Sequence, residues 1–166
     1  KVATIRPATV CGFSPRQRLD VIVNILTNFA FFKKEISVFG GDQLRPNVHI
    51  LDMVRSYEHL LMTDFSKING EIFNVGFENV SVNNLANTVK EVLGGDIAIK
   101  KIPTNDNRSY HISSDKIKKV LNFETKFSIR SAVIDLKNAF KNEILTNTFD
   151  NIKYYNIKVM NNINLK

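Results

Sequence analysis

The sequence predicts an α/β protein. Apolar residues recur with a period of two in some stretches and of about 3.6 in others, which is typical of strands that alternate with helices. Serine or aspartate stands before several of the helical stretches, and a pair of glycines follows one of them, as capping residues do. The 166 residues, 43% of them hydrophobic, suffice for one compact core and not for two.

The first half of the chain predicts strands around two helices. The predicted elements are a strand at Val2–Val10, a helix at Leu19–Phe32, a strand at Ile36–Gly40, an extended segment at Asn47–Ile50 and a helix at Met53–Met62. Pro46 prevents a helix before Asn47, since proline lacks the amide donor and restricts the residue ahead of it. Asp52 is placed to cap the second helix.

The second half continues the alternation up to Thr146. It predicts a strand at Glu71–Gly76, a helix from Ser81 to Gly94, a strand at Asp96–Pro103, a short helix from Ser114 to Leu121 and a longer one from Ser128 to Ile144. After Thr146 no clear period remains. We therefore expect one domain at residues 1–146 and, at residues 147–166, a frayed tail or an appended helix.

Composition restricts the class of protein. The net charge of +7 and the isoelectric point of about 9.5 fit either an anionic partner or an ordinary solvated surface. The single cysteine, Cys11, excludes an internal disulfide framework and favours a reducing, cytoplasmic setting. No apolar stretch approaches the roughly 20 residues that a membrane span needs, so we expect no membrane partner.

Three segments carry a resemblance to a known family. The first is IRPATVCG at Ile5–Gly12 with SPRQRLDVIVN at Ser14–Asn24, the second is FGGDQLRPNVHILDM from Phe39, and the third is NDNRSYHISSDKIKKVLNF, which contains Arg108. An aromatic ring offers a face for a nucleobase, glycines allow close approach of the backbone, and arginine binds phosphate through a fork of donors. Together these segments resemble extended short-chain dehydrogenase/reductases, the NAD-dependent epimerases and dehydratases of nucleotide sugars.

The resemblance extends from Ile5 to about Leu136, and it is close in style to the UDP-glucose 4-epimerase and dTDP-glucose dehydratase group. It implies the last strands of a Rossmann-like sheet plus the small α/β substrate-binding lobe. In that family the GxxGxxG loop, the acidic ribose ligand, the catalytic serine or threonine and the tyrosine/lysine pair all precede the segment that RPATV matches. We therefore expect this chain to be the second half of an enzyme and inactive alone. Tyr154 and Lys158 spell YxxxK, but they follow the lobe, and we reject them as catalytic.

The resemblance also implies the ligands and their contacts. The partner is a nucleotide diphosphate sugar, and the cofactor is NAD, held mainly by the upstream half of an enzyme that is expected to be a homodimer. The implied substrate contacts are Thr9, Arg16, Asn24, Phe39, Arg45 and Arg108, and Pro7 falls where the family's backbone passes the nicotinamide. Each has a plainer alternative: a core position for Phe39, a backbone-bonding role for Asn24, and solvent exposure or surface ion pairs for the arginines.

The sequence departs from the family at two positions in the first turn. Cys11 stands where tyrosine is usual and Phe13 where proline is usual, and we expect Cys11 to be a small buried hydrophobe and not a nucleophile. His49, His59 and His111 are too far apart in sequence to suggest a metal site.

Two alternative functions remain, a non-catalytic nucleotide-sugar binding lobe and a basic nucleic-acid-binding domain. We expect no nucleic-acid partner, because the basic residues do not interleave with aromatics. In a half-enzyme, the strands at Val2–Val10 and Glu71–Gly76 would expose apolar faces and unpaired edges.

Overall fold

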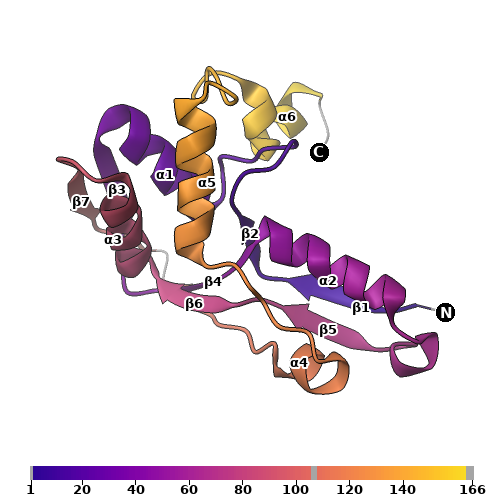
Figure 1. Ribbon diagram of the computed structural model, residues 1–166. Helices are drawn as coiled ribbons and strands as arrows, with labels where there is room; N and C mark the ends of the chain where they lie inside the picture. The colour runs from indigo at the N-terminus through magenta and orange to yellow at the C-terminus, as the bar shows by residue number, and fades with distance from the viewer. Residues whose placement is uncertain (1, 106–107, 164–166) are drawn as a thin grey trace.

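The computed structural model describes residues 2–105 and 108–163, and within them the predicted α/β fold is confirmed (Figure 1). The strands are β1 (Thr4–Pro7), β2 (Thr9–Cys11), β3 (Glu35–Phe39), β4 (Leu44–His49), β5 (Ile72–Val75), β6 (Glu78–Ser81) and β7 (Ala98–Ile102). The α-helices are α1 (Ile22–Lys33), α2 (Ile50–Met62), α3 (Val82–Leu93), α4 (Asp115–Leu121), α5 (Ile129–Lys141) and α6 (Asn156–Asn162), and the 3-10 turns are η1 (Phe65–Lys67) and η2 (Ile152–Tyr154).

The strands form three short sheets. β1 pairs in parallel with β5, β3 pairs in parallel with β7, and β4 lies between β2, to which it is parallel, and β6, to which it is antiparallel. The prediction of one strand at Val2–Val10 is wrong, because the chain changes its pairing partner at Ala8. β1 pairs with β5, and β2 pairs with β4. β6 was not predicted, and it forms by pairing with β4.

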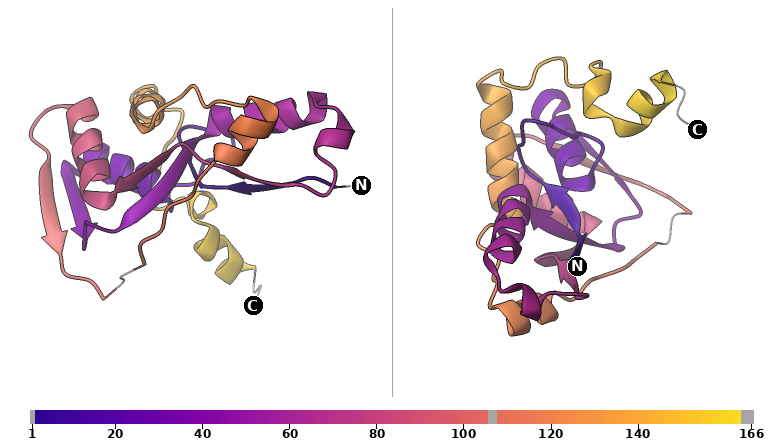
Figure 2. Two further views of the ribbon diagram at one scale, coloured as in Figure 1. Left: turned by 90° about the horizontal axis from the view of Figure 1, so that it is seen from below. Right: turned by 90° about the vertical axis from the view of Figure 1, so that its right-hand side faces the viewer.

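The helices divide the molecule into two parts. At one end α1, α3 and α5 pack together over the β3–β7 pair, and at the other end α2 and α4 lie beside the β1–β5 pair (Figure 1). α2 and α4 contact each other, since the His59 ring bonds the Leu121 carbonyl at 2.7 Å, and they share one cluster with the buried Phe73 and Val75 of β5. Figure 2 shows the same division, with the N-terminus at the far end of the β1–β5 pair. The central β2–β4–β6 sheet joins the two parts.

Two of the four predicted serine and aspartate caps are confirmed. Ser81 accepts a hydrogen bond from the backbone of Asn84, and Ser128 forms a reciprocal capping box with Ser131. Ser114 precedes α4, but its hydroxyl accepts instead from the backbone N–H of Gly76. The cap predicted at Asp52 is wrong: α2 begins at Ile50, and His49 caps it through Nδ1, which accepts from the N–H of Leu51 at 3.1 Å.

The chain beyond α5 returns to the loop that precedes α1. Tyr154 and Tyr155 pack beside a buried cluster that includes Leu19 and Phe140, and α6 follows them. Leu19 lies outside α1, which begins three residues later than predicted. The loop before α1 and the C-terminal segment are therefore in contact.

Several apolar side chains on the β1–β5 side remain uncovered. Val2, Ile72 and, on α2, Leu61 and Met62 are exposed, the last two by 85% and 88%. Within the described ranges β1 pairs with β5 along one edge and with no strand along the other. The unpaired edge expected of β1 is therefore observed, and Val2 and Ile72 are exposed, but Phe73 and Val75 of β5 are covered by the helices. No helix in the described part of the chain is long and apolar enough to cross a membrane.

Candidate functional site

A pocket of about 480 Å³ opens where β1 and β2 end and the chain turns toward α1. We call it the Thr9 pocket. Four residues implied by the family resemblance line it together: Pro7, Thr9, Arg16 and Asn24. Its other lining residues are Ala8, Val10, Cys11, Gly12, Ser14, Arg18, Val21 and Ile50.

The chemistry of the Thr9 pocket suits a polar ligand with an anionic group. Its lining includes two arginines and no aspartate or glutamate. Arg18 forms an ion pair with Asp20 at 2.9 Å, whereas Arg16 donates only to neutral oxygen acceptors among the described residues. A hydroxyl from Thr9 and one from Ser14 add donors and acceptors.

Two buried amides hold the wall of this pocket. Asn24 accepts from the backbone N–H of Gly12 at 3.0 Å and donates to the Arg18 carbonyl at 2.8 Å. Gln17, which the sequence analysis did not single out, donates to the same carbonyl at 2.9 Å and accepts from the N–H of Ser14 at 3.0 Å. Asn24 is thus at once a lining residue and the backbone-bonding amide of the plainer alternative. Nothing in the sequence marks Gln17 except its place between two arginines.

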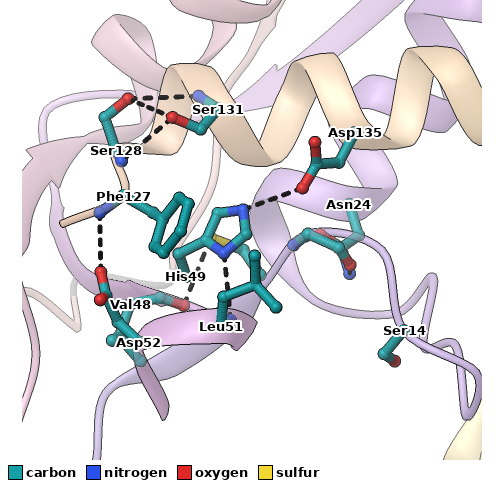
Figure 3. Close-up of polar contacts among 12 residues, drawn as sticks. Ser14, Asn24, Val48, His49, Leu51, Asp52, Phe127, Ser128, Ser131 and Asp135 are labelled. Atoms are coloured by element: carbon teal, nitrogen blue, oxygen red, sulfur yellow. Dashed lines mark hydrogen bonds and ion pairs between the residues drawn. The ribbon is translucent and has the colours of Figure 1, made fainter. Parts of the chain in front are cut away.

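A buried histidine lies behind the pocket (Figure 3). The His49 ring stacks on Phe127 with 5.0 Å between ring centroids, and Nε2 lies 3.2 Å from Oδ2 of Asp135 on α5. Because Nδ1 accepts from Leu51, a neutral His49 carries its proton on Nε2 and donates to Asp135. Burial lowers the pKa of His49, and the opposing effect of Asp135 is smaller. His49 therefore joins β4 to α5 as a neutral ring.

Cys11 faces the same interior. It is 1% exposed, and burial, aided by the negative charge of Glu78, raises the pKa of its thiol to about 12. A thiol with such a pKa is not a nucleophile at neutral pH. The prediction of a buried hydrophobe at this position is confirmed.

Asp52 fastens a remote segment to α2. Its carboxylate is fully buried and accepts from the backbone N–H groups of Lys126 at 2.9 Å and Phe127 at 2.8 Å, and from Arg55. Phe127 is the residue that stacks on His49. The aspartate of the second family-like segment therefore positions the wall behind the Thr9 pocket.

A second group of predicted residues meets at the start of β4. We call Phe39, Arg45 and Arg108 the arginine surface. Nη1 of Arg45 donates to the Arg108 carbonyl and, at 3.0 Å, to that of Leu44. The Leu44 N–H in turn donates to the Ser109 hydroxyl at 2.9 Å. Two arginine-bearing segments that are 63 residues apart in sequence therefore lie side by side.

Phe39 ends β3 six residues before Arg45 and is 54% exposed, so it is not a core residue. The turn that follows is held by Gln43, which donates to the Phe39 carbonyl and accepts from the N–H of Gly41, both at 2.6 Å. Gly41 has φ +127°, and a side chain there would overlap Asn83. Any other residue there would be strained by this φ and would displace the Asn83 side chain.

β4 links the two groups. Thr9 is paired with Asn47, which lies two residues beyond Arg45 on β4. At about 3.3 Å per residue this places the Thr9 backbone about 7 Å along the strand from Arg45. Asn47 is 1% exposed, and its Oδ1 has no hydrogen-bond partner among the described residues. One extended ligand could therefore reach both the arginine surface and the Thr9 pocket.

A further pocket of about 530 Å³ lies between the end of β5 and α4. His111, Ser113 and Lys118 are among its polar lining residues. None of the predicted site residues lines it, so it is separate from the two groups described above.

Comparison with known proteins points to one kind of enzyme, although no protein-family model matches the sequence. UDP-glucose 4-epimerase from Thermotoga maritima, solved with UDP-glucose, is 27% identical with a TM-score of 0.72, and the match covers 85% of this chain and 46% of that one. UDP-glucuronic acid 4-epimerase from Bacillus cereus, in complex with UDP-glucuronic acid and NAD, is 22% identical with a TM-score of 0.70 over 84% of this chain and 45% of that one. dTDP-glucose 4,6-dehydratase from Bacillus anthracis, in complex with NAD, is 21% identical with a TM-score of 0.69 over the same shares. This chain spans less than half the length of these structures.

Proposed function

Because this chain has the fold of the carboxy-terminal half of nucleotide-sugar epimerases and dehydratases, we propose that it is the nucleotide-sugar-binding part of an NAD-dependent enzyme of that kind. The resemblance predicted from the sequence is confirmed by these structures. In the proposal residues 1–146 form the substrate-binding part and residues 147–166 an appended segment. The observation that carries it is the meeting of the Arg45 and Arg108 segments, with an exposed Phe39 six residues before Arg45.

Each group has its own task in this proposal. Arg45 and Arg108 bind the diphosphate, since guanidinium forks match phosphate oxygens and form charge-assisted hydrogen bonds. The exposed ring of Phe39 offers a stacking face to the base. Thr9 and Arg16 reach the sugar from the Thr9 pocket, whose wall Asn24 supports. The span of about 7 Å along β4 separates the sugar subsite from the diphosphate.

In this proposal the chain supplies only a small part of the NAD-binding site. When bound, it would accept and return the hydride of the sugar. The chain fits this role at one place, since Pro7 borders the Thr9 pocket with an apolar ring, and no GxxGxxG loop occurs in the sequence. Other segments would therefore have to hold most of the cofactor. The exposed edge of β1 and the apolar surface of α2 suit such a segment, and the complete enzyme would be a cytoplasmic homodimer.

Isothermal titration calorimetry with UDP and UDP-glucose tests the proposal. Arg45→Ala and Arg108→Ala should each weaken UDP binding by about tenfold to a hundredfold, because a hydrogen bond to a charged group contributes roughly 1.5–3 kcal/mol. Arg130→Ala is the matched control, since Arg130 pairs with Glu91 on an exposed surface of α5. Equal affinities in all three variants would show that the arginine surface does not bind diphosphate.

The proposed function and a nucleic-acid-binding role make opposite predictions. If the proposed function is right, single-stranded oligonucleotides should bind weakly. UDP affinity should then depend little on charged residues elsewhere on the protein. Tight oligonucleotide binding that falls steeply with salt, together with no UDP binding, would support the alternative instead.

A further inference from the structure

The C-terminal segment lies against the loop that forms one wall of the Thr9 pocket. The backbone N–H of Leu19 donates to the Tyr154 carbonyl at 2.9 Å, and Asp20 Oδ2 accepts from the N–H of Asn156 at 2.8 Å. The last contact joins residues 136 positions apart. Tyr154 also packs beside the buried Leu19 side chain. The loop at residues 14–20 is thus held from outside by residues 148–163.

Arg16 is the loop residue most directly held. Its Nη1 donates to the carbonyls of Lys153 at 3.1 Å and Gln17 at 3.3 Å, and Nη2 donates to Oδ1 of Asn156 at 3.1 Å. All three acceptors are neutral, and no carboxylate pairs with Arg16 within the described residues. A guanidinium has five N–H donors, so the Nε–H and one Nη2–H are left for a ligand. The side chain is therefore fixed in place while its charge stays uncompensated.

Asp20 makes Arg16 and Arg18 differ in charge pairing, because it accepts a hydrogen bond from Arg18. Its Oδ1 accepts from Nε of Arg18 at 2.9 Å while its Oδ2 holds the start of α6. The positive charge of Arg18 is balanced by the Asp20 carboxylate, and that of Arg16 is not balanced by a carboxylate of the described residues. The C-terminal segment thus orders both arginines of the loop, and only Arg16 presents to the pocket a charge that is unpaired within the described residues.

We propose that residues 148–163 are a positioning element that holds Arg16 for the sugar of the ligand in the Thr9 pocket. The inference rests on the proposed function, because the ligand is the nucleotide sugar. Asn156 is a positioning residue: it acts through Arg16. Holding the long side chain in advance reduces the rotamer entropy that binding would otherwise cost.

Asn156→Ala tests this directly, and a chain ending at Tyr155 tests it without relying on one substitution. The shortened chain lacks α6, which has no buried residue, and keeps Tyr154 and Tyr155, which pack against the buried cluster. Both changes should weaken UDP-glucose binding about two- to tenfold, the effect of one hydrogen bond that orders the site. Arg130→Ala is again the control, because its ion pair with Glu91 involves neither the loop at residues 14–20 nor residues 148–163, so the affinity should be unchanged.

A coupling measurement separates positioning from general stabilisation. In an Arg16→Ala background the loss caused by Asn156→Ala should vanish, because both changes remove the same contact. Hydrogen exchange of the amides of residues 14–20 should also become faster in Asn156→Ala, with or without ligand. An undiminished loss in the Arg16→Ala background, wild-type affinity in both tail variants, or unchanged exchange would overturn the inference.

The two proposals fail in different ways. If Arg45→Ala weakens UDP-glucose binding but neither tail change does, the positioning role is wrong and the proposed function stands. If the unaltered protein does not bind UDP-glucose or UDP, the proposed function is wrong, and the positioning role falls with it.

Discussion

Replacement of Asp52 should cost more stability than any other single carboxylate substitution we consider. The side chain is fully buried and is the sole carboxylate that Lys126 and Phe127 contact through their backbone N–H groups among the described residues, at 2.9 and 2.8 Å. Asp52→Ala leaves both partly buried donors without this acceptor. At about 1.5–3 kcal/mol for each hydrogen bond to a charged group, the free energy of unfolding should fall by about 3–6 kcal/mol. A domain has only about 5–15 kcal/mol in total.

Asp52→Asn should cost less. Its remaining oxygen can still accept from the two backbone donors, but its amide nitrogen then faces Arg55, which is itself a donor. The expected loss is about 1.5–3 kcal/mol, the value of the one charged contact. Urea unfolding followed by far-ultraviolet circular dichroism measures both variants. Asp115→Ala, at an exposed position in the first turn of α4, should change stability by less than about 1 kcal/mol.

Hydrogen exchange locates the effect. The amides of Lys126 and Phe127 should lose protection in Asp52→Ala well before global unfolding. A loss of stability below about 1 kcal/mol, or full protection of both amides, would refute the view that this carboxylate fastens the segment behind the Thr9 pocket.

Three further predictions concern the turn, the buried histidine and the uncovered surface. Gly41→Ala should destabilise the protein by about 1–3 kcal/mol in urea unfolding, because a side chain would overlap Asn83 at a positive φ, whereas Gly70→Ala, also at positive φ but in open space, should cost less. The pKa of His49 is lower in the folded than in the unfolded state, so the unfolded state binds the proton first as the pH falls. Thermal stability should therefore fall as the pH drops below about 6.5. This part of the pH dependence should be lost in His49→Asn, which keeps an acceptor that can cap α2. The chain alone should express poorly or bind a hydrophobic dye, and Leu61→Glu should reduce that dye binding.

Each of these has a contradicting result. Equal costs for the two glycine substitutions would remove the argument from Asn83. Identical pH profiles for the unaltered protein and His49→Asn would show that this histidine does not control stability in acid. A monomer that melts cooperatively and binds no dye would show that the surface around α2 needs no cover.

The family resemblance named the residues of the candidate site and implied that they surround one ligand, but it did not give their division into two groups. The family-like segments identify Pro7, Thr9, Arg16 and Asn24, and the structure brings these four to one pocket. Their roles as ligand contacts stay predictions. Gln17 was missed because a buried amide has no local signature, and its importance comes from backbone groups that the folded loop turns inward.

The sequence by itself determined the features that depend on neighbours a few residues away. The alternation of strands and helices, the caps at Ser81 and Ser128 and the stop at Gly94 all follow from local periodicity and backbone geometry. Only the tertiary structure decided the pairing of β6 with β4, the cap at His49, the fastening role of Asp52, and the contacts of Arg45 with Arg108 and of Arg16 with Asn156. The physical reason is that a hydrogen bond between residues 63 or 140 positions apart is chosen by the packing of whole elements, and the spacing of residues along the chain does not encode that choice.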